Sequence, residues 1–379
     1  MSRRSILARV TASVPVVLLV ASVLFVAPHV AAAQDSARIA EVESVLARLV
    51  ESYGPSGAEG PVRAAVQQLL PAGVRAETDT AGNLVVRVGK GDPAVVVIAH
   101  LDEIGYRVTE IRDDGSLALA PVGGFFPSLY EGRPALVHAP SGAVPGVFVP
   151  RTATATASAG PPTRQPSEVA LDVGTDSRAA TERLGVRVGQ TVTMPKQYVR
   201  LAGTRATGRS FDDRVGCAAL VLALRKIDPA KLRHEVMFVF SVREEIGLEG
   251  AEAIAASLGT KAARVYAIDT FVSADSPLEV TTFGLAPIGA GPVARALDQS
   301  SVTPPAYVDS LTVLARARGI PLQVGATNGG NDGSVFAPWG VPDVPIGWPL
   351  RYSHSPAEVI DLRDAGHLAD LVQAIAEAW

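Results

Sequence analysis

Short apolar strands alternate with helical segments over most of this chain, and that alternation limits the fold more than any other feature. The run AVVVIA at Ala94–Ala99 is continuously apolar and rich in β-branched residues, as expected of a strand covered on both faces. Other strands are predicted at Leu84–Val88, Glu235–Ser241, Ala263–Asp269, Leu322–Gly325 and Val344–Gly347, and helices at Asp35–Tyr53, Gly60–Leu70, Arg214–Lys226, Leu248–Leu258, Tyr307–Arg318 and Leu362–Trp379. This order favours an α/β fold with a mixed, mostly parallel sheet flanked by helices.

A stretch of different character interrupts the alternation. Short alternating strands are separated there by Asp-Gly, Gly-Gly, Ser-Gly and Pro, the turn signals of an all-β module. We therefore predict an inserted small all-β domain within an α/β catalytic domain. The predicted divisions are a signal peptide at 1–33, an N-terminal segment of the catalytic domain at 34–104, the inserted β-domain at 105–201 and a C-terminal segment of the catalytic domain at 202–379.

The first 33 residues have the order of an export signal. Three arginines and no acid precede the nearly uncharged apolar run Val10–Pro28, and Ala31–Ala33 supplies a small-residue processing site. We predict cleavage after Ala33 and a periplasmic or extracellular protein with no stable membrane association. The segment Ser2–Leu7 also resembles a twin-arginine signal. An uncleaved membrane anchor is the alternative, because the apolar run is nearly long enough to span a bilayer.

The overall composition excludes two kinds of site. The single cysteine, Cys217, allows neither an intrachain disulfide framework nor a cysteine-based zinc site. A formal net charge of −4 without a basic block argues against a nucleic-acid partner. Because the chain has only one cysteine, any metal must be held by histidines and carboxylates.

Polar residues follow three of the predicted strands at the point where each strand ends. His100–Glu103, Glu244–Glu245 and Asp269 take these places, while Asp212–Asp213 and His354 come before helices. Sites in open α/β sheets form beyond the carboxyl ends of the strands, so these segments could converge. Two imidazoles with several carboxylates and no thiolate suit Zn²⁺, Mn²⁺ or Co²⁺, and a carboxylate that can bridge suits a two-metal site. Each residue alone has an ordinary alternative, such as a structural histidine, a solvated turn or a helix cap.

Six segments, in this order, resemble the family of TET-type, glutamyl and deblocking aminopeptidases, which are di-metal metallopeptidases with an inserted β-domain. They are AHLDEIGYRV (Ala99–Val108), SFDDRVGCAALV (Ser210–Val221), FSVREEIGLEGA (Phe240–Ala251), AIDT (Ala267–Thr270), GGND (Gly329–Asp332) and RYSHSPAEVIDLRD (Arg351–Asp364). The resemblance covers essentially all of the chain after the signal. It implies a phosphorylase/hydrolase-like version of the α/β fold.

The resemblance also implies a role for each matched residue. Asp212 would bridge two metals, Glu244 would be the general base, and Asp102 would orient the imidazole of His100. The remaining ligands would be His100 and Asp269 for one metal and Glu245 and His354 for the other. Asp213 is expected to cap a helix or support the site, and the role of Asp332 stays open.

The export signal and the family resemblance together predict an exported di-metal aminopeptidase. It would hydrolyse N-terminal residues from peptides through a metal-bridging water. The expected cofactors are two divalent ions, zinc first, with cobalt or manganese as alternatives. A metal-dependent amidase or deacylase that shares the site, and a non-catalytic binding module, are the competing hypotheses. Side-chain preference and the native metal stay open, and so does a homo-oligomer, since members of the family assemble into hollow dodecamers.

Overall fold

The computed structural model describes residues 35–91, 94–150, 169–273, 275 and 285–379. The predicted signal peptide at 1–33 lies outside these residues. The chain divides into two compact units, 1–41 and 42–379. In the first unit, the described residues 35–41 are helical. In the part of the chain that the structure describes, no helix combines the length and the apolar character needed to cross a membrane.

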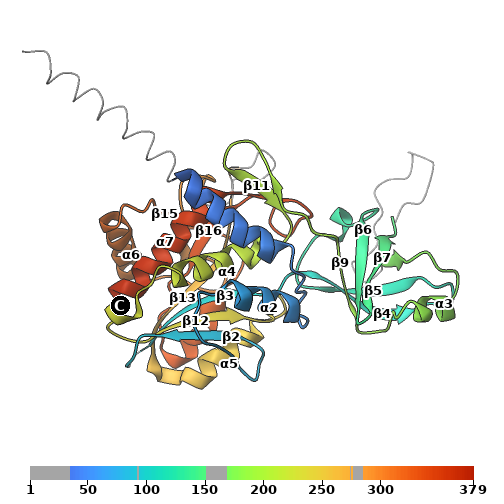
Figure 1. Cartoon of the computed structure of the whole chain (residues 1–379), viewed down its shortest axis with the longest axis horizontal. Helices are drawn as coiled ribbons and strands as arrows, with labels where there is room; N and C mark the ends of the chain where they lie inside the picture. The colour runs from blue at the N-terminus through green and yellow to red at the C-terminus, as the bar shows by residue number, and fades with distance from the viewer. Residues whose placement is uncertain (1–34, 92–93, 151–168, 274, 276–284) are drawn as a thin grey trace, which may run out of the picture. The chain divides into compact units, whose positions relative to one another are not determined.

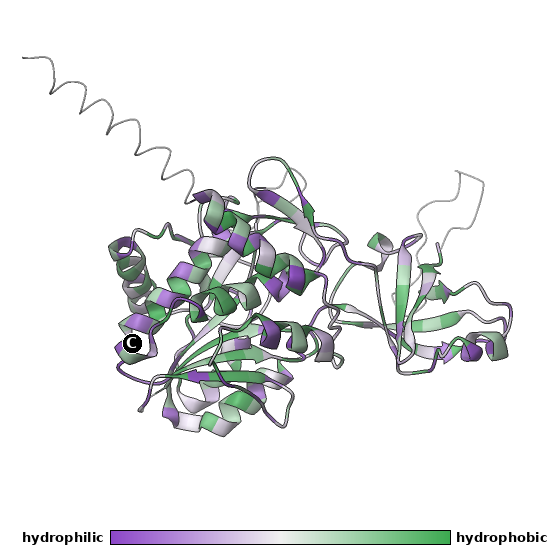
Figure 2. Cartoon of the chain, in the orientation of Figure 1, coloured by the Kyte–Doolittle hydropathy of each residue, from purple (hydrophilic) through white to green (hydrophobic). Residues whose placement is uncertain are grey.

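An eight-stranded sheet forms the centre of the second unit, which confirms the predicted fold class (Figure 1). Its strands lie in the order β1 (Ala76–Thr78), β2 (Leu84–Val88), β12 (Val236–Ser241), β3 (Ala94–His100), β13 (Ala262–Val272), β16 (Ile346–Leu350), β14 (Val293–Leu297) and β15 (Gln323–Ala326). Four neighbouring pairs are parallel and three are antiparallel. Every residue of β3 and β12 is buried, and the central strands are coloured as hydrophobic in Figure 2.

Helices pack against the sheet and account for that burial. Helix α4 (Phe211–Leu224) packs on β3, β13 and α7 (Leu362–Ala378). A separate apolar core joins side chains of β3 and β12 to α5 (Glu249–Leu258) and to η5 (Asp332–Trp339). Helices α2 (Gly60–Leu69) and α6 (Pro305–Ala317) are further helical elements of the described α/β region, in which residues 42–50 are also helical.

A closed barrel interrupts the α/β region. Its strands follow the order β4 (Gly105–Ile111), β5 (Leu117–Val122), β8 (Ala170–Asp172), β7 (Gly142–Phe148), β6 (Pro134–Ala139) and β9 (Thr191–Thr193), with the short helix α3 (Arg178–Arg183) between β8 and β9. The barrel encloses its own aromatic core, in which Tyr106, Tyr130 and Phe148 are buried. The exact limits of the inserted domain stay a prediction. A small sheet of β10 (Val199–Arg200), β11 (Arg205–Gly208) and β17 (Glu358–Asp361) follows the barrel.

Two strands differ from the predicted elements in ways that affect the site. The sequence pattern does not predict strand β14, because its sequence VARAL places Arg295 where a buried strand normally carries an apolar residue. Arg295 is nevertheless 1% exposed, since acidic partners accompany it. Strand β13 does not end at Asp269, as the pattern predicts, but continues to Val272, because its last residues pair with β16.

A candidate metal centre at the edge of the main sheet

Three of the predicted segments reach the same edge of the sheet. Strands β3 and β12 are parallel, and their register places Ser241 beside His100, so the segment with Glu244 and Glu245 starts next to His100. Strand β13 pairs with β3 only as far as Ala267. Asp269 therefore lies beyond the end of β3, although it is still inside its own strand. Parallel pairing alone brings the first group of candidate residues together.

The beginning of α4 separates the roles of two adjacent aspartates. Asp212 (φ −73°, ψ 110°) and Asp213 (φ −111°, ψ 44°) have non-helical backbone angles. Asp213 Oδ1 accepts hydrogen bonds from the backbone N–H of Gly216 at 2.9 Å and from the indole N–H of Trp348 at 3.2 Å. A Cβ at position 216 would clash with the Asp213 carboxylate, so this contact requires glycine. The expectation that Asp213 caps and supports the helix is confirmed.

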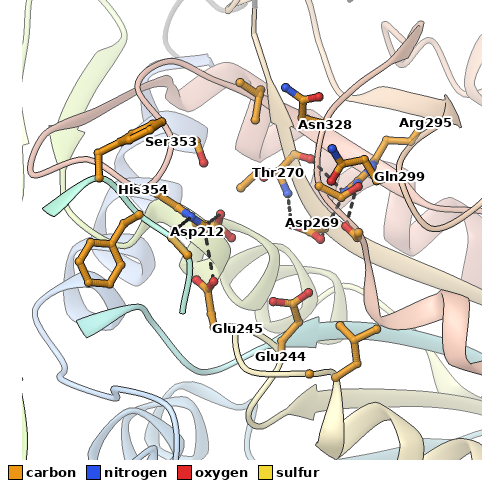
Figure 3. Close-up of a pocket in the computed structure, with 18 residues that line it drawn as sticks. Asp212, Glu244, Glu245, Asp269, Thr270, Arg295, Gln299, Asn328, Ser353 and His354 are labelled. Carbon is orange, nitrogen blue, oxygen red and sulfur yellow. Dashed lines mark hydrogen bonds and ion pairs between the residues drawn. The ribbon is translucent and has the colours of Figure 1, made fainter. Parts of the chain in front are cut away.

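Asp212 has imidazoles on both sides of its carboxylate. Its Oδ1 lies 3.1 Å from Nε2 of His100, and its Oδ2 lies 3.2 Å from Nε2 of His354. His354 Nε2 is also 3.5 Å from Oε2 of Glu245, as the dashed lines in Figure 3 show. A carboxylate that presents one oxygen to each of two histidines has the form needed to join two cation sites.

The second nitrogen of each imidazole faces an oxygen that orients the ring. His354 Nδ1 lies 2.5 Å from the carbonyl oxygen of Gly124, and a carbonyl can only accept, so Nδ1 carries the proton. His100 Nδ1 lies 3.6 Å from Oδ1 of Asp102, slightly beyond hydrogen-bond distance. In both residues this leaves Nε2 directed toward Asp212, as in metal-binding histidines.

Asp102 also accepts three hydrogen bonds that the sequence did not predict. Its carboxylate accepts the backbone N–H groups of Glu244 at 3.0 Å and of Glu245 at 3.2 Å, and the hydroxyl of Ser56 at 2.6 Å. Asp102 is completely buried, so these bonds hold the Glu244–Glu245 turn against the end of β3. No sequence signal marks Ser56, which lies far from the other segments along the chain.

A cavity of about 940 Å³ opens over these residues. Five of the seven predicted site residues line it, namely Asp212, Glu244, Glu245, Asp269 and His354 (Figure 3). His100 and Asp102 are buried beneath the lining. Arg295, which the sequence did not single out, is the one arginine or lysine among the described lining residues. It is paired with Asp269 Oδ2 at 3.2 Å and with Asp298 Oδ2 at 3.0 Å.

Burial and the repulsion between neighbouring carboxylates raise the pKa values of several acids in this group. Burial, with the nearby carboxylate of Asp212, raises the pKa of Glu245 to about 7. Burial also raises the pKa of Glu244 well above its ordinary value, and the Asp269 and Glu245 carboxylates add to this against the opposing effect of His100. The pKa of Asp269 is raised by burial, although Arg295 opposes the shift. Additional cations would relieve this repulsion.

The donor set fits such cations. Ligand atoms of His100, Asp212 and Glu245 all lie within 4.8 Å of one another. Imidazole nitrogens and carboxylate oxygens without sulfur suit first-row divalent metals. The described residues therefore offer a donor set that could hold a metal ion.

Two further residues resolve into structural roles. Asp332 is 4% exposed, and its Oδ2 accepts the hydroxyl of Ser241 at 2.5 Å, so it supports the end of β12. It is not among the residues described as lining the cavity. Cys217 is fully buried in α4, and its thiol donates to the carbonyl of His100 at 3.1 Å.

Comparison with known families places this arrangement among peptidases. Residues 82–371 match the family described as M42 glutamyl aminopeptidase. A putative aminopeptidase of Acetivibrio thermocellus is 31% identical over 341 residues, which cover 87% of this chain and 97% of that protein.

Solved structures give the same result. The aminopeptidase APDkam598 from the archaeon Desulfurococcus kamchatkensis superposes with a TM-score of 0.83 at 30% identity, over 90% of this chain and 96% of that one. The TET1 peptidase of Pyrococcus horikoshii, described as able to assemble into a tetrahedron or a large octahedral shell, superposes with a TM-score of 0.82 at 30% identity. That match covers 88% of this chain and 99% of the TET1 chain.

Proposed function

Because the chain belongs to the M42 glutamyl aminopeptidase family and is therefore a peptidase, we propose that it is an exported di-metal aminopeptidase with Glu244 as its general base. The observation that carries the di-metal proposal is the position of Asp212, whose two oxygens face two different imidazoles at 3.1 and 3.2 Å. The proposal of export rests on the sequence of residues 1–33.

The proposed ligands divide around Asp212. His100 and Asp269 would hold one ion, Glu245 and His354 would hold the other, and Asp212 would contribute to both. Zinc is the proposed ion, with cobalt and manganese as alternatives that accept the same donors. Bound divalent ions at this centre would polarise the scissile carbonyl and make water a stronger nucleophile.

The surroundings of Glu244 support its proposed role as the general base. It lines the cavity, and its Oε2 lies 3.9 Å from His100 Nε2, so it stands beside the ligands. The Asp102 carboxylate accepts a hydrogen bond from the backbone N–H of Glu244, which holds this residue in position. Bound cations would lower its raised pKa, so that the carboxylate could accept a proton from water and return it to the leaving amine.

Restriction to the chain end requires recognition of a free α-amino group. The carboxylates that line the cavity make it acidic, which favours a positively charged ammonium group. Arg295 offers no unpaired charge for a substrate carboxylate, because Asp269 and Asp298 already bind its guanidinium. These features support cleavage at amino termini.

Hydrolysis of aminoacyl p-nitroanilides and of their N-acetylated counterparts tests the proposal, before and after chelation with metal add-back. We expect metal-dependent cleavage of the free-amine substrates only. Cleavage of the blocked substrates alone would support the competing deacylase, and no cleavage of either set would favour a binding module.

Export and assembly are tested separately. Cell fractionation with N-terminal sequencing is expected to give a mature protein that begins at Gln34 outside the cytoplasm. An intact N-terminus in the membrane fraction would indicate an anchor, and one in the cytoplasm would reject export. The assemblies described for P. horikoshii TET1 support a homo-oligomer here, which light scattering of the purified protein would detect or exclude.

A further inference from the structure

One buried carboxylate joins two of the segments that carry proposed ligands. Glu358, the first residue of β17, is 2% exposed. Its Oε2 accepts the backbone N–H of Phe211 at 2.7 Å, and its Oε1 accepts the backbone N–H of His354 at 3.1 Å. Phe211 immediately precedes Asp212. The same side chain therefore binds the main chain on both sides of the contact between Asp212 and His354.

The backbone of these two segments needs such a restraint. Ser210 (φ 65°), Tyr352 (φ 63°) and His354 (φ 57°) are non-glycine residues in the left-handed region. That conformation is disfavoured for residues with a Cβ and persists only where surrounding contacts enforce it. The two hydrogen bonds of Glu358 lie within this strained backbone.

The register of the small sheet fixes Glu358 in place. Strands β11 and β17 are antiparallel, and Gly208 lies opposite Glu358. The chain leaves β11 at Gly208 and reaches Phe211 three residues later, so the sheet delivers the carboxylate to the start of α4. The remainder of β17 leads directly into α7, where Asp361 caps the helix by accepting the N–H of Arg363 at 3.0 Å.

Glu358 is not itself placed as a ligand. It is absent from the described lining of the main cavity, and each of its oxygens accepts a backbone N–H. We infer that Glu358 is a positioning residue that sets the distance between Asp212 and His354, and with it the affinity of the metal pair. This inference rests on the proposed function, because it concerns the same two ligands.

The variant Glu358→Gln tests the inference without a change in side-chain size. A glutamine offers one acceptor and one donor, so it can satisfy only one of the two N–H groups. We expect metal affinity, measured by titration of the apoprotein with Zn²⁺, to fall about 10- to 100-fold, the usual effect of losing such a supporting contact. With metal near the wild-type saturating concentration, kcat should fall while KM stays within about threefold.

Two further variants separate positioning from general stability. Asp361→Asn, on the same strand, removes the ion pair of Asp361 with Arg363 at the start of α7, and we expect a slightly lower Tm with unchanged Zn²⁺ affinity. Glu358→Asp keeps the carboxyl group and shortens the reach, and we expect affinity between those of the wild type and Glu358→Gln. It also serves as the test if the glutamine variant does not fold.

The outcomes distinguish this inference from the proposed function. Wild-type protein that binds no divalent ion and cleaves no substrate would overturn both. Wild-type protein that binds and cleaves, with Zn²⁺ affinity unchanged in the Glu358 variants, would overturn the positioning role alone. A loss of affinity in Asp361→Asn equal to that in Glu358→Gln would also overturn it.

Discussion

Two clusters of buried charged residues lie near the end of β3, and their charge is balanced in different ways. We call them the Glu103 cluster and the Asp212 cluster, after the carboxylate at the centre of each. Glu103 is fully buried and receives Lys196 Nζ at 2.5 Å, Arg209 Nη1 at 3.0 Å and Arg214 Nη2 at 3.4 Å. The group around Asp212 contains several carboxylates and two imidazoles, and its nearest arginine is shared with Asp298.

The pKa directions express this difference. Burial opposes ionisation of Glu103, but Lys196, Arg209 and Arg214 hold its pKa well below the usual range. Burial raises the pKa of Glu245 to about 7, and Asp212 adds to the effect. In the first cluster the chain supplies its own cations, whereas in the second the carboxylates outnumber the cations that the described residues supply. The first cluster therefore supports the fold, and the second is the proposed metal site.

The largest effect is expected at Glu244, the proposed general base of the Asp212 cluster. Glu244→Gln removes the proton acceptor but no proposed ligand, so kcat should fall by about 10²- to 10⁴-fold while metal content stays at the wild-type level. Steady-state kinetics with elemental analysis of the purified protein would check both values. Activity retained by this variant would contradict the assigned mechanism.

Disrupting the Glu103 cluster should mainly lower the stability of the folded protein. Glu103→Gln leaves three buried cations without their counter-charge, and we expect a loss of about 3–5 kcal/mol in the free energy of unfolding. Urea denaturation measures this loss. The matched control is Glu235→Gln, which removes a surface pair with Arg87 and should cost about 0–1 kcal/mol. Equal losses in the two variants would show that the buried ion pairs of Glu103 stabilise the fold no more than a surface pair does.

Metal removal should distinguish the two clusters. Free metal at about 100 times its Kd is expected to add about 2.7 kcal/mol to the free energy of unfolding, and chelation should remove this contribution. Asp212→Asn should lose most of the metal-dependent shift in Tm. Glu103→Gln should keep the shift, because its cluster needs no added ion. A metal-independent Tm in the wild type would argue against the proposed centre.

A pH dependence is expected within the Glu103 cluster. Burial lowers the pKa of Lys196 to about 7 against the attraction of Glu103, with Arg214 and Arg209 adding to the decrease. Between pH 7 and the ordinary lysine value of 10.5, the unfolded chain binds more protons than the folded chain, so stability rises with pH in this window. The Tm of the wild type should therefore increase relative to Lys196→Met from pH 7 to pH 10.

Thermal melts at several pH values measure that difference. The surface variant Lys226→Met, which removes a pair with Asp370, is the control and should show no such trend. A constant difference between the wild type and Lys196→Met would contradict the lowered pKa.

Sequence reasoning succeeded where local pattern and residue type were sufficient. The buried run at Ala94–Ala99 became β3, and the polar segments after β3 and β12 reached one edge of the sheet. It was less successful for Arg295, because a single arginine in a short apolar segment gives no sign that buried acids will accompany it. Glu358 stood inside a quoted motif, but nothing in the motif showed which backbone groups it would bind.

By itself, the sequence determined the sheet with its flanking helices, the exclusion of cysteine chemistry and the residue types available for a metal. The resemblance gave the two adjacent aspartates different roles, but only the tertiary structure shows the contacts that separate them. Asp213 turns back to cap α4, and Asp212 lies between His100 and His354. The physical reason is that periodicity and helix propensity act over a few residues, whereas these contacts join segments more than a hundred residues apart, which only the packed sheet brings together.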